Sequence, residues 1–306
     1  MGIQRIESVI YSVDDLDTCV RFFTDLGLAL AGKGEDHAVF ETLIGQTLHL
    51  RTGAATEGLP PSVEPGNNTI REVVWGADTE QDVEAFVAAL SKDREVTQDA
   101  DGVFHTVDET GFGVGLTVAG MSRHENKAPR PANVSGSVNR LNQALSSVGD
   151  VKPLRMCHVA LNIPKAGREE AVAFYVDRLG FIPTDVVKPM GVFMRVPGDA
   201  DQHNFLLCHR PDRASVNHVS FEVPGFDDVI EGGNAMIEKG WQEARKLGRH
   251  TVGSNVFRFV HAPSGGRVEL AADMDRVDDT YGPNVHETAP PHHIWTLRTS
   301  RDASEA

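Results

Sequence analysis

The sequence predicts an α+β fold made of two tandem domains, each a pair of βαβββ modules. Two observations indicate this fold: the second half of the chain repeats the first, and each half contains the order strand, helix, strand, strand, strand twice. Strands therefore outnumber helices, and several of them are joined as hairpins. That combination favours α+β over a doubly wound parallel sheet.

The first module of each half opens with the alternation of a short strand, at residues 6–13 and at residues 156–163. An amphipathic helix pattern follows in both halves. Each helix pattern stops at a glycine, Gly27 in the first half and Gly180 in the second, where the C′ position of a helix favours glycine.

The second module of each half begins with one strand, residues 70–75 in the first half and residues 217–222 in the second. The two strands resemble each other, and a helix pattern follows each. Each half then ends in a hairpin whose turn contains glycine. The predicted hairpin strands are residues 104–107 and 114–116 in the first half, and residues 257–260 and 268–270 in the second.

These patterns divide the chain into three parts. Residues 1–120 form an N-terminal module pair, residues 121–152 a polar linker with one short helix at most, and residues 153–306 a C-terminal module pair followed by a tail. After Asp275 the periodicity disappears, and we expect a polar, frayed terminus.

Composition excludes several classes of partner. The 306 residues contain 44 acidic and 29 Lys or Arg side chains, a formal charge of −15, which disfavours nucleic acid and an anionic membrane. No apolar run reaches the ~18 residues of a spanning helix, and the first residues lack the layout of a signal peptide. The three cysteines are scattered and are expected to be reduced core thiols, so a cytoplasmic location is predicted.

The candidate metal ligands lie on three predicted strands of the second half: His158, His218 and Glu269. Alternation of apolar and polar neighbours predicts that all three point to one side of the sheet. Two imidazoles and one carboxylate form a facial triad, which suits Fe(II) because open positions remain for substrate and O2. Mn(II) accepts the same ligands.

The first half provides an internal control for this prediction. The matching positions hold Ser8, Glu72 and, after a gap of one residue, Gly115. Those three residues cannot form the same site. A purely structural requirement for the triad would apply to both halves, so the asymmetry favours a function for the second.

Around the triad the sequence resembles the vicinal oxygen chelate (glyoxalase-like) superfamily, and the whole chain resembles a two-domain, type I extradiol ring-cleavage dioxygenase. That resemblance implies a C-terminal cavity holding Fe(II), a degenerate N-terminal half, a catechol and O2 as substrates, and a homo-oligomer. It also implies that His203 acts as acid and base on bound oxygen and that His250 contacts the substrate hydroxyl. The stretches that carry the resemblance are residues 158–162, 202–206, 217–221, 248–251 and 263–270.

One position departs from the family pattern. Many members have a substrate-binding Tyr on the strand after the second cavity histidine, and here the corresponding residue is Phe259 or its neighbour Arg258. Phe259 cannot donate a hydrogen bond and predicts an apolar wall, compatible with a substituted or bicyclic catechol. An inward Arg258 would bind a substrate carboxylate, and alternation makes an outward Arg258 equally compatible.

Three alternatives remain at this stage: a hydroquinone-cleaving dioxygenase, a glyoxalase-like metal-dependent isomerase or lyase, and a non-catalytic protein that binds an aromatic ligand. The histidines outside the proposed site have simpler interpretations. His209 is expected at the surface, His286 in a polar tail, and His292 and His293 in the same tail rather than over the cavity mouth with Trp295.

Overall fold

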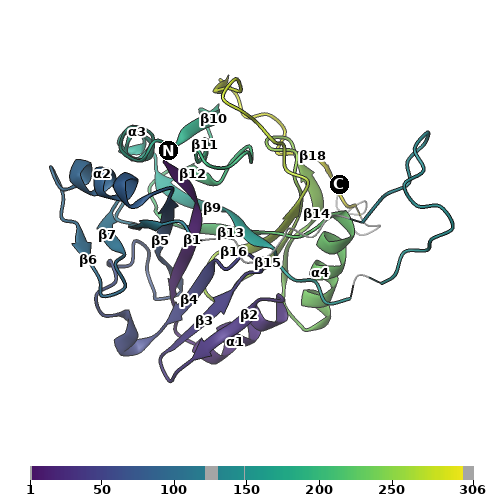
Figure 1. The fold of residues 1–306 in the computed structure, drawn as a ribbon, viewed down its shortest axis with the longest axis horizontal. Helices are drawn as coiled ribbons and strands as arrows, with labels where there is room; N and C mark the ends of the chain where they lie inside the picture. The colour runs from purple at the N-terminus through teal and green to yellow at the C-terminus, as the bar shows by residue number, and fades with distance from the viewer. Residues whose placement is uncertain (1, 121–129, 148, 299–306) are drawn as a thin grey trace.

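The computed structural model describes residues 2–120, 130–147 and 149–298, and it contains two sheets, one from each half of the chain (Figure 1). The first sheet has eight strands in the order β2-β3-β4-β1-β5-β8-β7-β6, and the second has ten in the order β17-β10-β11-β12-β9-β13-β16-β15-β14-β18. Four βαβββ modules are present in the predicted order, which confirms the α+β prediction.

The N-terminal half contains two modules, which span 3–51 and 69–118. The first comprises β1 (Ile3–Ser12), α1 (Leu16–Asp25), β2 (Ala29–Lys33), β3 (His37–Glu41) and β4 (Thr47–Arg51), followed by the short 3-10 helix η1 (Gly53–Thr56). The second comprises β5 (Thr69–Ala77), α2 (Glu80–Leu90), β6 (Thr97–Gln98), β7 (Phe104–Val107) and β8 (Gly113–Val118).

The C-terminal half repeats this order and adds two strands from the tail. Its first module comprises β9 (Arg155–Pro164), α3 (Arg168–Ala173) with a π-helical turn η2 (Phe174–Arg178), β10 (Ile182–Val187), β11 (Gly191–Arg195) and β12 (Phe205–Arg210). Its second comprises β13 (Ser215–Glu222), α4 (Phe226–Glu238), β14 (Glu243–His250), β15 (Val256–His261) and β16 (Arg267–Ala272); the tail contributes β17 (Asn284–His286) and β18 (His293–Thr296).

Helix α1 shows how local sequence sets the ends of an element. Asp15 caps its first turn by accepting a hydrogen bond of 2.9 Å from the Thr18 amide. Gly27 follows the helix at φ 100°, and a Cβ at this position would lie 2.1 Å from the Val151 carbonyl oxygen. Glycine is therefore required there both by backbone conformation and by space.

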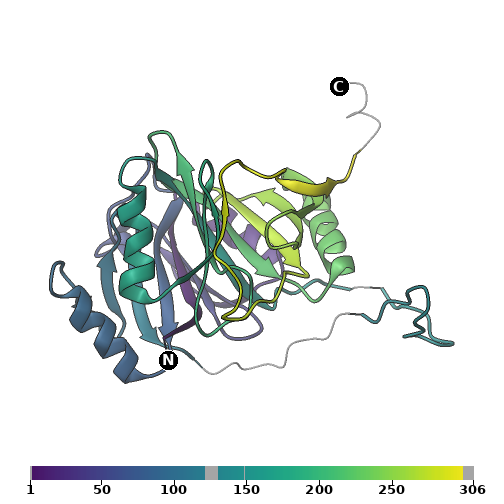
Figure 2. The ribbon, with the colours of Figure 1, turned by 90° about the horizontal axis from the view of Figure 1, so that it is seen from above.

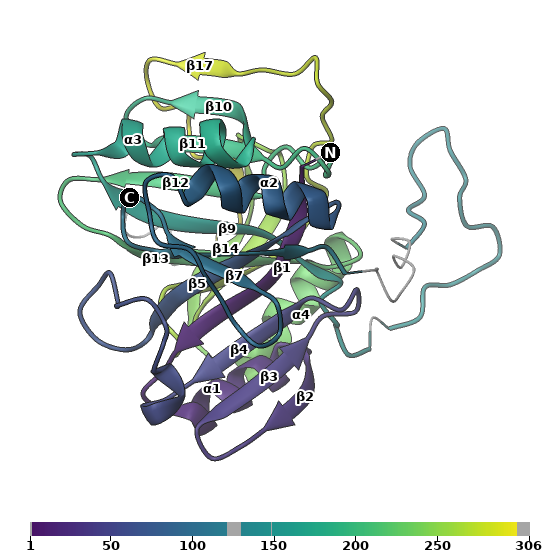
Figure 3. The ribbon, with the colours of Figure 1, turned by 60° about the vertical axis from the view of Figure 1, so that its left-hand side comes forward.

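The tail differs from the prediction. Residues expected to form a frayed terminus add β17 beside β10 (Figure 3) and β18 beside β14 (Figure 1), at the two edges of the larger sheet. In the linker, the described residues 130–147 and 149–152 contain no helix; residues 130–147 extend away from both sheets (Figures 1 and 2). Within the described residues, no helix is long and apolar enough to cross a membrane.

One aromatic cluster joins the two halves. Trp75 on β5 is fully buried, and its ring packs edge-on against Phe181 and Phe205 with centroids 4.9 and 5.4 Å away. Its indole Nε1 has no hydrogen-bond partner among the described residues. The contribution of Trp75 to stability therefore comes from packing rather than from a polar contact.

We predict that Trp75→Ala lowers the free energy of unfolding by about 3–5 kcal/mol, because the cavity opens at the junction of the halves. Trp75→Phe keeps a six-membered ring and removes three heavy atoms, among them the unpaired donor, so it leaves a smaller cavity and costs about 1–3 kcal/mol. Urea unfolding monitored by circular dichroism measures both values. Equal losses for the two variants would contradict a packing role.

Candidate active site

Three neighbouring strands bring His158, His218 and Glu269 together. The Nε2 atoms of the two histidines are 3.0 Å apart, and Glu269 Oε2 lies 2.9 Å from His158 Nε2 and 3.5 Å from His218 Nε2. All three side chains are buried, and Glu269 is completely so. The prediction that they share one side of the sheet is confirmed.

Strand register produces this meeting. The central strand β13 runs antiparallel to β9, with Ser220 opposite His158, and parallel to β16, with Ser220 opposite Glu269 and His218 opposite Arg267. Ser220 is thus the common partner of His158 and Glu269, and His218 lies two residues before Ser220, on the same face of the sheet. A slip of one residue would turn a candidate side chain to the other face.

The N-terminal sheet has the same register without the same chemistry. Ser8 lies opposite Val74, Glu72 opposite Gly113, and Val74 opposite Gly115. These pairs correspond to those of the second half, including the gap of one residue that the sequence comparison required. The alignment of Ser8, Glu72 and Gly115 with the triad is therefore confirmed.

The triad has the spacing and charge of a divalent metal site. Ligand atoms ~2.0–2.2 Å from one ion at right angles lie about 3 Å from each other, close to the separations of the three atoms here. Burial opposes ionisation of Glu269, yet the facing His158 holds the pKa of this carboxyl well below its usual value. Burial lowers the pKa of His218 well below its ordinary value. One carboxylate oxygen thus lies 3.5 Å from the neutral ring of His218 and 2.9 Å from His158 Nε2.

A side-chain amide fixes the tautomer of His218. Asn217 Oδ1 accepts hydrogen bonds from Arg267 and from His218 Nδ1, the latter at 2.8 Å, while Asn217 Nδ2 donates to Asn162 Oδ1 at 2.9 Å. Because Arg267 can only donate, Asn217 must present its oxygen to His218. His218 then carries its proton on Nδ1 and directs the Nε2 lone pair toward the triad.

A similar relay fixes His203. Gln202 Nε2 donates to Asp185 Oδ2 at 2.7 Å and to Thr184 Oγ1 at 3.1 Å, so Gln202 Oε1 accepts from His203 Nδ1 at 2.7 Å. The His203 ring lies 4.4 Å from the His158 ring, centroid to centroid. Its Nε2 is therefore an unprotonated nitrogen on the wall of the cavity.

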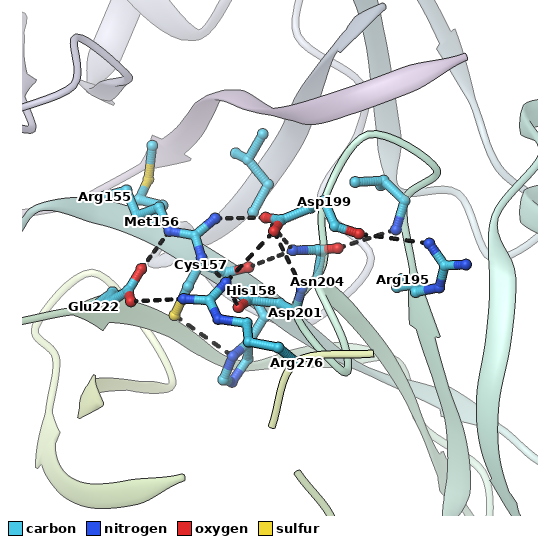
Figure 4. Close-up of polar contacts among 12 residues, drawn as sticks. Arg155, Met156, Cys157, His158, Arg195, Asp199, Asp201, Asn204, Glu222 and Arg276 are labelled. Carbon is cyan, nitrogen blue, oxygen red and sulfur yellow. Dashed lines mark hydrogen bonds and ion pairs between the residues drawn. The ribbon is translucent and has the colours of Figure 1, made fainter. Parts of the chain in front are cut away.

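The loop that carries His203 is tied to the strand that carries His158 (Figure 4). Arg155, at the start of β9, forms ion pairs of 2.5 Å with both Asp199 and Asp201, and it also pairs with Glu222 on β13. Asn204 Nδ2 donates to the Cys157 carbonyl at 3.2 Å. These contacts hold the loop against β9 and thereby set the position of His203 relative to the triad.

His250 and Phe259 complete the cavity, which has a volume of about 270 Å³. His250 Nε2 lies 3.5 Å from Glu269 Oε1, and its ring stacks on Phe257 with centroids 4.0 Å apart. Phe259 is buried and packs edge-on against His218 at 5.1 Å. The structure therefore brings His203, His250 and Phe259 into the same cavity as the triad.

Arg258 lies outside this cavity, so of the two orientations left open the outward one is observed, and the inward one, with its role in substrate binding, is wrong. Its guanidinium pairs with Glu243 at 2.8 Å and donates to Asn234 Oδ1 at 2.7 Å and to the Ile230 carbonyl at 3.1 Å. Alternation along β15 turns Phe259 inward and Arg258 toward α4. Three partners on that side satisfy the cation.

One expectation for the tail was wrong. Pro290, Pro291 and His292 line the cavity, so this segment is not merely a polar terminus. Trp295 does not join them; its nearest aromatic neighbour is Phe226, 6.3 Å away. Pairing of β18 with β14 places the prolines over the cavity, and the short polar strand gave no periodic signal.

Two further histidines also differ from expectation. His209 is buried rather than exposed, and neither ring nitrogen has a hydrogen-bond partner among the described residues. Its strand β12 is buried along most of its length, which a short run of sequence did not reveal. His286 on β17 contacts Asp185 at 2.6 Å and so belongs to the relay behind His203.

A second group of histidines lies nearby. Ring nitrogens of His250, His292 and His293 fall within 4.8 Å of one another. This group contains no carboxylate, and its three histidines are half-buried or exposed. It is therefore a poorer match than the buried triad to the two-histidine, one-carboxylate site that suits Fe(II).

The N-terminal half has a cavity of its own, of about 540 Å³. There the buried Glu72 is occupied by an ion pair of 2.9 Å with His105, which also contacts Asp99 at 3.2 Å. Among the described residues of this cavity, no three ligand atoms lie close enough to hold a metal.

Comparisons with known proteins agree with this architecture. Residues 155–270 match the model of the Glyoxalase/Bleomycin resistance protein/Dioxygenase superfamily. Metapyrocatechase 2 of Cupriavidus necator is 30% identical over 184 residues, which cover 58% of this chain and 55% of that protein. Biphenyl-2,3-diol 1,2-dioxygenase of Paraburkholderia xenovorans strain LB400 is 28% identical over 45% of this chain and 47% of its own. The chain thus spans about half the length of these curated relatives.

Solved structures match over nearly the whole chain. The Mn(II)-bound glyoxalase from Novosphingobium aromaticivorans has a TM-score of 0.71 at 22% identity, covering 98% of this chain and 99% of that one. BphC, a halotolerant catechol dioxygenase, has a TM-score of 0.74 at 16% identity, covering 99% and 96%. The chain therefore has the glyoxalase-like tandem fold of these enzymes.

We predict that His203 and His218 are both neutral Nδ1–H tautomers in the metal-free protein. Replacing Gln202 with Met removes the acceptor from His203 alone and should shift only that ring toward the other tautomer or a mixture. Long-range proton–nitrogen correlation spectra of the imidazoles report the tautomer directly. An Nε2–H tautomer of His203 in the unmodified protein would contradict the relay.

We further predict that β18 detaches as the pH falls. Partial burial, with His250 and Arg245 nearby, lowers the pKa of His292 to about 3 and of His293 to about 4. The detached tail has ordinary values near ~6.5, so it takes up protons first, and docking is lost below that pH. Amide exchange of β18 should accelerate between about pH 7.5 and about pH 5.5 beyond the intrinsic rate change. The β1–β4 pair is the control, and an equal response of both would contradict this account.

Proposed function

We propose that the protein is an Fe(II)-dependent extradiol dioxygenase, which cleaves the ring of a catechol next to its vicinal hydroxyls with O2. The observation that carries this proposal is the buried cluster of His158, His218 and Glu269, open on one side to a cavity that contains His203 and His250. Three protein ligands on one face leave positions for two substrates.

The three ligand side chains would hold the metal as a facial triad. Bound there, Fe(II) supplies a template for both substrates and stabilises charge that develops between them. Mn(II) accepts the same donors. Asn217 contributes by keeping the His218 lone pair directed at the ion, a role that outer hydrogen bonds commonly have in metal sites.

His203 is placed to move protons. Gln202 occupies its Nδ1, so Nε2 accepts the proton of a substrate hydroxyl and returns it later. Burial, and then the neighbouring His158, lowers the pKa of His203 well below its ordinary value, which keeps the ring in the accepting form before substrate binds. His250 supports a substrate oxygen from the other side of the triad, and Phe259 forms the apolar wall.

The cavity favours a single-ring catechol. Its volume of about 270 Å³ lies below the ~300–1,000 Å³ typical of ligand pockets. Among the relatives, metapyrocatechase and biphenyl-diol dioxygenases carry names that fit this chemistry. An isomerase or lyase is the alternative, because a Mn(II)-bound glyoxalase shares the fold. That alternative gives no role to His203 and its relay.

We predict that the protein binds one divalent ion per chain and that Glu269→Ala abolishes this binding. Two neutral imidazoles alone lack the charge that a hard divalent ion requires. Glu72→Ala, at the matching position of the N-terminal half, is the control and should retain the ion. Plasma emission spectrometry of each dialysed variant measures how much metal it retains. Loss in the Glu72 variant or retention in the Glu269 variant would refute the assignment.

The activity is tested by anaerobic reconstitution with Fe(II), followed by an O2-electrode screen of catechols. We expect one O2 consumed per ring opened and a coloured ring-opened product. In His203→Gln, turnover should fall by roughly 10²–10⁴-fold while the metal content is unchanged. A fully loaded protein that consumes no O2 with any catechol would overturn the proposal.

A further inference from the structure

We propose that the cavity contains an anion subsite, formed by Arg245 and Arg267 with Arg210 beside them, which binds a carboxylate on the substrate ring. This inference rests on the proposed function for the identity of the ring, but the subsite itself is a separate feature of the structure. The expected substrates are therefore catechols with an acidic substituent.

The three guanidinium groups come from three different strands of the C-terminal sheet. Arg210 ends β12, Arg245 lies on β14 and Arg267 begins β16, and all three line the cavity that the triad opens into. Their convergence on one cavity is therefore a product of the fold and not of a local run of basic sequence.

Strand register separates these cations from the metal ligands by about the length of one aromatic ring. Arg267 precedes Glu269 by two positions on β16, so both side chains share a face about 6.6 Å apart along the strand. Arg245 lies opposite Phe259 on β15, and Phe259 lies opposite Glu269. A ring whose hydroxyls face the triad thus extends along Phe259 toward the two arginines.

No carboxylate neutralises these arginines. Within the described ranges, no ion pair joins Arg245 or Arg267 to an acidic side chain, whereas Arg258 on the outer face of the same sheet pairs with Glu243 at 2.8 Å. The aromatic contact of each is Phe259, whose ring centroid lies 5.3 Å from the Arg245 guanidinium carbon and 5.2 Å from that of Arg267. In a chain of charge −15, two adjacent unneutralised cations are a specific feature.

The environment makes these charges costly without a ligand. Burial, and then Arg245, lowers the pKa of Arg267 to about 10. At neutral pH both groups still carry their charge, and each disfavours the other. An anion between them relieves that repulsion, and a planar carboxylate matches the planar fork of a guanidinium.

The other cavity residues do not provide that anion. Arg267 already donates to Asn217 Oδ1, which leaves its remaining N–H groups for a ligand. His292 lies on the same cavity, but its low pKa keeps it neutral at pH 7, and neutral imidazole does not offset a cation. Glu269 is committed to the histidines of the triad.

The test uses the metal-free protein and isothermal titration calorimetry, so that its readout is independent of turnover. The probes are protocatechuate and its carboxamide, which have the same shape and differ in charge, together with the isomeric pair in which the substituent adjoins a hydroxyl. We expect at least one carboxylate to bind roughly 10–100-fold more tightly than its amide. Equal affinity within both pairs overturns the subsite.

Two variants locate the preference. Arg245→Met should reduce the ratio of carboxylate to amide affinity to about one to three, and Arg245→Lys should retain part of it. Arg258→Met, on the outer face of the same strand pair, should leave the ratio unchanged. Thermal unfolding verifies that each variant is folded. A ratio that survives in Arg245→Met and Arg267→Met alike, or is lost in Arg258→Met, overturns the assignment.

The outcome is distinguishable from that of the proposed function. Charge selectivity in the metal-free protein supports the subsite even if the iron-loaded protein consumes no O2. Conversely, ring cleavage of neutral and carboxylated catechols with equal kcat/KM, and no dependence on Arg245, supports the dioxygenase while it overturns the subsite.

Discussion

The register of β13 between β9 and β16 is the constraint on which the site depends. It places two imidazoles and a carboxylate from distant parts of the chain within 3.5 Å of one another, in a buried position. Such a cluster is unfavourable without a compensating ion, because it buries a carboxylate against two ring nitrogens that lie only 3.0 Å apart. The outer hydrogen bonds, the loop bearing His203 and the arginines near Phe259 all take their positions from the same sheet.

The N-terminal half has the same strand register as the C-terminal half but lacks the three metal-ligand side chains. The N-terminal sheet reproduces the ladder, yet its buried Glu72 is paired with His105, and among the described residues of its cavity no three ligand atoms lie close enough to hold a metal. The scaffold therefore does not need the triad. What the N-terminal half supplies instead is packing, most directly through Trp75, which contacts aromatic side chains of the second half.

Much of this arrangement could be predicted from the repeat. Alternation within strands and the match between halves located His158, His218 and Glu269 correctly, because both signals depend on the local periodicity of two. The tail could not be predicted in that way, since β17 and β18 are short edge strands that pair with distant elements. The orientation of Arg258 depends on packing against α4, and the burial of His209 depends on how deeply β12 lies in the sheet. The sequence of one strand alone predicts neither feature.

The central claim is that the C-terminal triad, and no other cluster of the described chain, holds the metal. Anomalous diffraction from crystals loaded with Fe(II), recorded at the iron absorption edge, tests it most directly. The account predicts a single strong peak bonded to His158 Nε2, His218 Nε2 and Glu269. A principal peak among His250, His292 and His293, or beside Glu72 and His105, would contradict it.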